Sequence, residues 1–249
     1  MITTYHRPTT LPEALALIKK ENVYPLGGGI QLSQFSDAEY EVVDLQALAL
    51  NKITKKGNLL EIGATATLQA LLEIPEIPEA LQKALQHEAA LNTRNSATVA
   101  GTLVASDGRS PFTVMMMGLD AEVTVTSEQE SVISKLGDLL PLRDEVLAGK
   151  LITKISIPLN QNAKYEYVAR TPADKPIICA ALSQWPGGRT RLVFGGWGKS
   201  PALAMDGKGI NGIEEAAKNA THDAGDQWAS AEYRQDVAVT LAKRCLGLG

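Results

Sequence analysis

Cysteine, histidine and aromatic residues are scarce in this chain of 249 residues. Its two cysteines, Cys179 and Cys245, are too few for a disulfide framework and lack the CxxC spacing of a metal or redox motif. The three histidines lie far apart in the sequence, which disfavours a zinc or iron site made by this chain alone. With only 5% aromatic residues, any bound flat ring would rest largely on aliphatic side chains and backbone.

Basic stripes and long apolar runs are also missing. The net charge is −4, and no basic stretch is interleaved with aromatic residues, which argues against a nucleic-acid partner. No apolar run is long enough to span a membrane, and the opening residues 1–4 do not begin a signal peptide. We therefore expect a cytoplasmic protein. Its 45% hydrophobic and 21% charged residues are typical of a globular chain with a sizeable core.

The pattern of apolar residues predicts mixed helices and strands. Helical spacing is found at 11–18, 78–91, 111–118, 211–219 and 230–246, and Thr67 is a candidate N-cap for a short helix through residue 72. Strands are expected at 23–26, 41–45, 59–64, 121–126, 151–157, 163–169, 177–184 and 189–195. A boundary near 158–163 would separate a larger α/β region from a smaller region of strands and helices.

Three consecutive glycines, Gly27 to Gly29, follow the expected strand 23–26. Each interior glycine costs roughly 0.5–1 kcal/mol of stability relative to alanine, so a run of three needs a physical reason. The run lacks the GxGxxG spacing of a dinucleotide-binding turn and the GK[ST] ending of a P-loop. Its N–H groups are able to converge on an anion such as a diphosphate, because no Cβ blocks the approach. A plain turn between strand and helix would also account for the glycines.

A second segment, 92–112, is rich in small and hydroxyl-bearing residues and shows little periodicity. Irregular segments of about twenty residues are uncommon inside compact domains and are usually functional. Within it, small and hydroxyl-bearing residues alternate from Thr98 to Thr102. Hydroxyls and exposed N–H groups suit phosphate and ribityl oxygens, although a polar surface loop with side-chain-capped turns would use the same residues.

Together the two segments resemble the flavin-binding subunits of molybdenum hydroxylases, which include the medium subunit of carbon monoxide dehydrogenase and the flavin domain of xanthine dehydrogenase. That family carries A-G-G-[TH]-[DS]-L followed by I-R-N-x-[GA]-T-[IV]-G-G-N, and residues 25–32 and 93–102 match these motifs in order and separation. Shorter matches along nearly the whole chain are 5–8, 60–64 with Thr67, 155–158, 195–198 and 230–234.

The resemblance implies an α+β fold with two domains. Residues 1–160 would form a two-part FAD-binding domain of the molybdopterin-dehydrogenase (PCMH-like) type, with subdomains at about 1–55 and 56–160. Residues 161–249 would form a small C-terminal domain of one sheet and helices, of the carbon monoxide dehydrogenase flavoprotein type.

The resemblance also implies the function of an oxidoreductase flavoprotein with FAD as cofactor. The expected partners are a [2Fe–2S] subunit, which supplies electrons, and a large molybdopterin subunit, which oxidises the substrate. This chain would pass the electrons to an external acceptor and would not oxidise the substrate alone. No catalytic residue or metal ligand is expected in it. Carbon monoxide, a purine, an aldehyde and an aromatic acid all stay open as substrates, because the molybdenum subunit makes that choice.

The cofactor-binding residues that the resemblance implies come from both segments and from later positions. They are Leu26, Gly27, Gly28, Gly29, Ile30, Gln31, Leu32, Thr98, Val99, Ala100, Gly101, Thr102, Ser106, Ser110, Ile152, Arg170 and Asp174. The glycines would leave room for diphosphate oxygens, and Thr98 and Thr102 would face the phosphates or the ribityl chain. Arg170 and Asp174 would lie near the flavin ring, unless they form only an ion pair across a turn. Ile152 would pack on the ring or serve as a plain core residue.

Four positions depart from the family pattern. Ile30 replaces a polar residue, Ala100 and Thr102 replace glycine and asparagine, and Ser110 stands where the family has an aspartate. Loss of one charged hydrogen bond costs about 1.5–3 kcal/mol, roughly ten- to a hundredfold in affinity. Because the changes keep small or hydrogen-bonding residues, we expect FAD to be retained. The alternatives are a structural subunit that has lost FAD and a free-standing flavin oxidoreductase.

Overall fold

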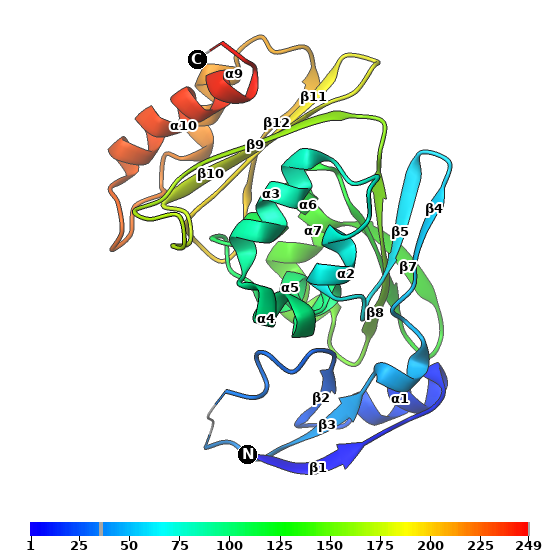
Figure 1. The fold of residues 1–249 in the computed structure, drawn as a ribbon. Helices are drawn as coiled ribbons and strands as arrows, with labels where there is room; N and C mark the ends of the chain where they lie inside the picture. Colours follow the sequence, from blue (N-terminus) through cyan, green and yellow to red (C-terminus); the bar gives the residue numbers. More distant parts are fainter. Residues whose placement is uncertain (35–36, 249) are drawn as a thin grey trace. The chain divides into compact units, whose positions relative to one another are not determined.

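A computed structural model describes residues 1–34 and 37–248 (Figure 1). The chain forms two compact units, each assembled from three separate segments. Unit 1 comprises Met1–Glu73, Leu91–Ala105 and Glu122–Ser156, and unit 2 comprises Ile74–Ala90, Ser106–Ala121 and Ile157–Gly249. The predicted boundary near 160 lies in the connection between two strands, β8 (Leu151–Pro158) and β9 (Asn162–Val168). The division into domains at 160 stays a prediction.

Unit 1 begins with a small parallel sheet of order β1-β3-β2. Its strands are β1 (Ile2–His6), β2 (Val23–Leu26) and β3 (Tyr40–Asp44). Helix α1 (Leu11–Ile18) covers one face, where its apolar stripe packs on Val23 and Val43. Because side chains alternate along a strand, Tyr5, Tyr24 and Asp44 lie on the other face. The carboxyl ends of all three strands meet at one edge.

A five-stranded sheet of order β4-β5-β8-β6-β7 completes the strands of unit 1. The four strands beside β8 are β4 (Ile53–Lys56), β5 (Leu59–Gly63), β6 (Glu122–Thr126) and β7 (Ser131–Lys135). The helices of this unit after α1 are α2 (Leu68–Leu72), α4 (Leu91–Ser96), α5 (Val99–Ala105), α7 (Leu136–Leu139) and α8 (Arg143–Val146), with 3-10 turns η1 (Gln46–Leu48) and η2 (Leu140–Leu142). As predicted, Thr67 caps α2, because its hydroxyl accepts a hydrogen bond from the Ala70 N–H at 3.0 Å.

Unit 2 has three layers around an antiparallel sheet of order β12-β11-β10-β9 (Figure 1). The strands beside β9 are β10 (Ile178–Gln184), β11 (Arg189–Gly195) and β12 (Ala202–Lys208). Helices α9 (Ile213–Ala220) and α10 (Ala231–Cys245) cover one face, and α3 (Glu79–Glu88) and α6 (Pro111–Gly118) cover the other. Strand β10 is therefore buried on both faces, which explains its apolar run from Ile178 to Leu182.

The mixed helices and sheets confirm the α+β class, but the prediction for the segment 92–112 is wrong. Instead of an irregular loop it contains most of α4, all of α5 and the start of α6. Helix α4 buries none of its residues and α5 is short and contains a glycine and a threonine, so neither shows a helical apolar stripe. Strands β1, β4, β7 and β12 were not anticipated, since none of them contains a buried residue and none shows a clear apolar alternation.

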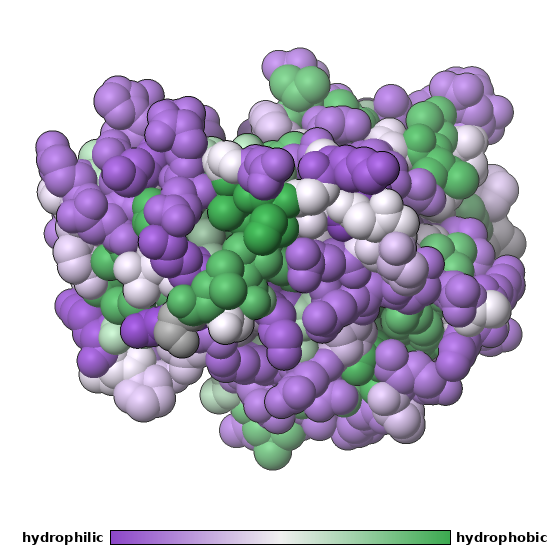
Figure 2. Space-filling view, turned by 90° about the horizontal axis from the view of Figure 1, so that it is seen from above, coloured by the Kyte–Doolittle hydropathy of each residue, from purple (hydrophilic) through white to green (hydrophobic). Residues whose placement is uncertain are grey.

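Hydrophilic residues are spread over the surface that Figure 2 shows, and hydrophobic residues form interrupted groups among them. Within the described parts of the chain, no helix combines the length and the apolar character needed to cross a membrane.

Arg234 has the largest fully buried side chain of unit 2. Its guanidinium, on α10, has no exposed surface. It donates hydrogen bonds to the carbonyl of Ile177, just before β10, at 2.9 Å and to the carbonyl of Gly196, just after β11, at 3.3 Å. It also makes a bidentate ion pair with Asp226, at 2.9 and 3.0 Å. This one side chain therefore joins α10 to the ends of β10 and β11.

The half-buried carboxylate of Glu88 lies at the amino end of α6. It accepts hydrogen bonds from the Ser110 hydroxyl at 2.6 Å and from the Phe112 N–H at 3.0 Å. Ser110 is fully buried and caps α6, because its oxygen also accepts from the Thr113 N–H. Burial raises the pKa of Glu88, while the hydrogen bond from Ser110 opposes that rise.

We expect Arg234→Met to lower the free energy of unfolding by on the order of 3 kcal/mol, because Asp226 and several buried carbonyls lose their donor. Urea unfolding measures the change. Arg244→Met, an exposed position on the same helix, is the control and should change stability little. Equal effects of the two substitutions would contradict the conclusion that Arg234 joins α10 to the ends of β10 and β11.

We expect Glu88→Gln to change how stability depends on pH. Because the raised pKa of Glu88 means tighter proton binding in the folded chain, its contribution is most favourable below the usual value of 4.5 and decreases as pH rises through the raised pKa. The wild-type chain should therefore lose stability relative to Glu88→Gln between acidic and neutral pH. Urea unfolding across this range, with the exposed Glu79→Gln on the same helix as control, tests the sign. A difference that stays constant or grows with pH would contradict it.

Candidate functional site

The glycine bend, residues Gly27–Gln31, begins where β2 ends at the carboxyl edge of the parallel sheet. Gly29 has φ +74°, a left-handed conformation that favours glycine, and the Ser33 N–H donates to the Gly29 carbonyl at 2.8 Å to close one turn. The bend is partly exposed, and the side chains of Ile30 and Gln31 are exposed. Such an edge of a parallel sheet is where ligands bind in α/β proteins.

The second predicted segment forms the junction between α4 and α5. Thr98 is buried at this junction, and its hydroxyl oxygen accepts a hydrogen bond from the Gly101 N–H at 3.2 Å. The Thr102 hydroxyl donates to the Thr98 carbonyl at 2.9 Å. Both threonine hydroxyls thus make hydrogen bonds within the junction. Their predicted contact with phosphate or ribityl oxygens is not needed to explain their positions.

The N–H groups at the start of α5 are also engaged within the protein. Val99 donates to the Ala66 carbonyl at 2.8 Å, and Ala100 donates to the Ala64 carbonyl at 3.1 Å. Val99 and Ala100 are buried as well. This junction therefore has no donor left on its first three residues after Thr98 for a bound anion.

The glycines of the bend pack directly against this junction. A Cβ at position 28 would lie 1.7 Å from the Ser96 carbonyl oxygen, and one at position 27 would lie 2.8 Å from the Thr98 hydroxyl oxygen. From the other side, a Cβ at position 101 would lie 2.7 Å from the same hydroxyl. Protein atoms thus occupy the space beside Gly27, Gly28 and Gly101, which differs from the expectation that these glycines leave it open for phosphate.

The free donors of the site are instead the main-chain N–H groups of the bend. From Gly27 to Gln31, none of them donates a hydrogen bond to another residue in the described part of the chain. Neighbouring N–H groups on a bend form a concave site for anions. The glycine bend can therefore bind an anionic group on the side that does not face the α4–α5 junction.

The remaining predicted residues of unit 1 are apolar. Ile30 is 43% exposed beside the free N–H groups, and Leu26 and Leu32 are half-buried. Ile152 is buried in β8, opposite Val125 of β6. Its position is that of a core residue of the five-stranded sheet, which was one of the two expectations for it.

Four predicted residues belong to unit 2. Ser106 and Ser110 are buried and both hydrogen-bond with the Thr113 hydroxyl, at 2.7 and 2.9 Å. Arg170 and Asp174 form an ion pair at 3.3 Å in the connection between β9 and β10, as the simpler of the two expectations has it. The connection is held further by His87 on α3, whose Nε2 lies 2.8 Å from the Asp174 carbonyl oxygen.

Cation–π contacts with Trp228 also hold this connection. The guanidinium groups of Arg170 and Arg109 both lie over the ring of Trp228, at 4.6 and 4.7 Å from its centre. Arg109 in addition donates to the carbonyls of Lys175 and Pro176. The sequence did not identify Arg109 or Trp228 as site residues.

Sequence reasoning missed two further residues that shape these positions. The Ser96 carbonyl, which meets Gly28, is a main-chain group and leaves no side-chain signal. Glu88, whose carboxylate accepts a hydrogen bond from the Ser110 hydroxyl, lies at helical spacing with the buried Leu81, Ala84 and Leu85. That spacing is the signal that could have identified it.

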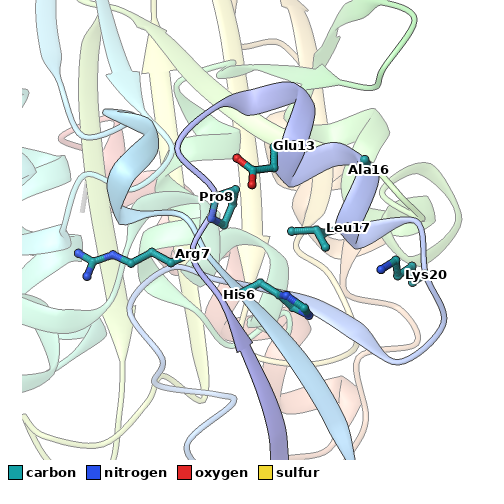
Figure 3. A pocket seen from close by; sticks show the side chains of 7 residues that line it. All are labelled: His6, Arg7, Pro8, Glu13, Ala16, Leu17 and Lys20. Carbon is teal, nitrogen blue, oxygen red and sulfur yellow. The ribbon is translucent and has the colours of Figure 1, made fainter.

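A shallow hollow of about 330 Å³ lies beside β1 and α1 (Figure 3). Its lining residues are His6, Arg7, Pro8, Glu13, Ala16, Leu17 and Lys20. None of the predicted cofactor-binding residues lines it. Across residues 1–34 and 37–248, no group of histidine, cysteine, aspartate or glutamate side chains is arranged to hold a metal ion.

Comparison with known proteins bears on this arrangement. Residues 1–160 match the family described as the FAD binding domain in molybdopterin dehydrogenase. The chain is 25% identical to the glyceraldehyde dehydrogenase medium chain of Sulfolobus acidocaldarius, with 97% of this chain and 96% of that one covered. It is also 25% identical to the uncharacterized protein YgfM of Escherichia coli, with 97% and 94% covered.

The fold has solved counterparts as well. The reconstituted carbon monoxide dehydrogenase from Oligotropha carboxidovorans contains a chain that superposes with a TM-score of 0.83 at 23% identity, covering 99% of this chain and 98% of that one. These findings confirm the resemblance and the cofactor inferred from the two motifs. The chain belongs to the family of FAD binding domains in molybdopterin dehydrogenase, and its cofactor is FAD.

Proposed function

We propose that this chain is the electron-transfer subunit of a molybdenum-containing hydroxylase or dehydrogenase complex. It takes electrons from a [2Fe–2S] subunit and passes them to an external acceptor. The observation that carries the proposal is the glycine bend, whose N–H groups make no hydrogen bond within the described residues and lie at the carboxyl edge of a parallel sheet. Family membership and the likeness to a glyceraldehyde dehydrogenase medium chain support it.

In this proposal the N–H groups from Gly27 to Gln31 hold the diphosphate of FAD. Ser96 and Thr98 keep the bend in place from behind, because they occupy the space that side chains at positions 27 and 28 would need. Ile30 offers an apolar surface beside these donors. When bound, FAD supplies a redox centre that accepts and releases electrons singly or in pairs. The chain itself contributes binding and orientation.

The proposal extends to unit 2 and to the domain division at 160. In it Arg170 and Asp174 are polar neighbours of the flavin part of FAD, and the buried Ser106 and Ser110 act only through their hydrogen bonds with Thr113. Two observations show that Arg170 and Asp174 are held in place. They are joined in an ion pair, and Trp228 and His87 fix the connection that carries them. A rigid charged pair alters the electrostatic potential at a redox centre without needing to move.

We expect the purified chain to bind added FAD and Gly28→Ala to bind it at least roughly tenfold more weakly. The new methyl group would meet the Ser96 carbonyl and push the bend away from the junction that shapes it. Quenching of flavin fluorescence on titration gives the dissociation constants. Chemical unfolding of both proteins separates lost binding from lost folding.

Gly187→Ala is the matched control, because a Cβ at position 187 would meet no atom within 4 Å. It should bind FAD as the wild-type chain does. Equal binding by Gly28→Ala and the wild type would show that the bend does not hold the cofactor. A wild-type chain that takes up no FAD would instead favour a structural subunit that has lost FAD. The observation in favour of that alternative is that the α4–α5 junction uses its hydrogen-bond donors internally.

We expect the tagged chain, isolated from its native cells, to carry iron and molybdenum in fixed ratio to flavin. The metals would belong to partner chains, because the described residues of this chain offer no metal site. Metal analysis and mass spectrometry of the purified complex measure both. A lone flavoprotein, free of iron and molybdenum, would support the free-standing oxidoreductase and contradict the proposed complex.

A further inference from the structure

Arg7 lies in register with the glycine bend. In the parallel sheet His6 pairs with Val43, and on the other side of β3 Leu26 pairs with Asp44. The residue after His6 therefore shares a row with Asp44 and Leu26. Residues of one row point to the same face, which here is the face opposite α1. Arg7 and the start of the glycine bend are two strand spacings apart, about 10 Å, at the same edge.

The side chain of Arg7 leans over the middle strand toward that bend. Its Nε lies 3.8 Å from an Asp44 carboxylate oxygen, and its side chain is 66% exposed. Arg7 lines one side of the hollow beside α1, and Figure 3 shows its side chain extending away from Leu17 and Lys20, which also line it. No described residue other than Asp44 pairs with its guanidinium.

Asp44 does not depend on Arg7 for its hydrogen bonds. The carboxylate is buried and accepts from the Tyr5 hydroxyl and from the Gln46 N–H, the latter at 2.9 Å. Its negative charge, one position before the strand end, would repel a diphosphate at the neighbouring bend. A guanidinium placed over it cancels this charge and keeps free N–H groups for a second acceptor.

We propose that Arg7 is a further diphosphate-binding residue of the FAD site, with Asp44 and Tyr5 positioning it. This inference rests on the proposed function, because it requires the diphosphate to lie at the glycine bend. The bend then supplies neutral main-chain donors, and Arg7 supplies the cationic partner for the phosphate oxygens. Arg7 thus connects the end of β1 to the site formed after β2.

The test is a titration of the full chain with FAD and with ADP at several salt concentrations. Arg7→Gln should weaken the binding of both by about tenfold or more, which is the usual effect of losing a charged hydrogen bond. It should also reduce the salt dependence of the dissociation constant, because one ion pair fewer is screened. Arg7→Lys, which keeps the charge, should recover part of the loss and restore the salt dependence.

Lys20→Gln is the matched control, since it removes an exposed cation of the same subdomain beside α1. It should leave the binding of FAD and ADP unchanged. If Arg7→Gln binds both as the wild type does, or if Lys20→Gln loses as much, the role of Arg7 is overturned and the proposed function stands. If the wild-type chain binds neither molecule, both proposals fail together.

Discussion

The contact between Gly28 and the Ser96 carbonyl is the constraint on which the site in unit 1 depends. It brings the bend after β2 against the junction of α4 and α5 more closely than any residue with a side chain would allow. The Thr98 hydroxyl lies between Gly27 and Gly101, so that glycines from both segments enclose one polar atom. Because the N–H groups beginning α5 bind the carbonyls of Ala64 and Ala66, the junction is tied in turn to the end of β5 and the start of α2.

This packing fixes the bend on the side of the α4–α5 junction and leaves its N–H groups without protein partners in residues 1–34 and 37–248. The junction uses its own donors internally, whereas those of the bend have no partner among the described residues. As the bend is partly exposed, water can satisfy these groups without the large cost of burying them unpaired. A site whose donors are already aligned also loses little conformational entropy on binding. The glycines thus allow the close packing that shapes the site, and the main-chain N–H groups supply its hydrogen-bond donors.

The sequence predicted those parts of the fold whose signal is local. Strand 23–26, the Thr67 cap and the helix 111–118 were placed within a residue of their observed bounds, because alternation, capping chemistry and a proline start each act over a few residues. The α4–α5 region was missed, since its helices are stabilised by tertiary contacts rather than by an apolar stripe. In the candidate site, the motif located Gly28 but could not show Ser96 behind it. Likewise, the sequence showed that Ser110 stands where the family has an aspartate. It could not show that α3 brings the carboxylate of Glu88 to hydrogen-bond distance of Ser110.

The interleaving of the two units has a consequence for synthesis of the chain. Helices α3 and α6 are made early, yet the sheet on which they pack, β9 to β12, comes from residues beyond Asn162. Every residue of α6 is buried, so this helix leaves the ribosome as an apolar segment whose partner strands do not yet exist. Long-range contacts of this kind slow folding and leave apolar surface uncovered in the meantime. Helix α6 therefore stays uncovered until the strands of the last third of the chain have emerged.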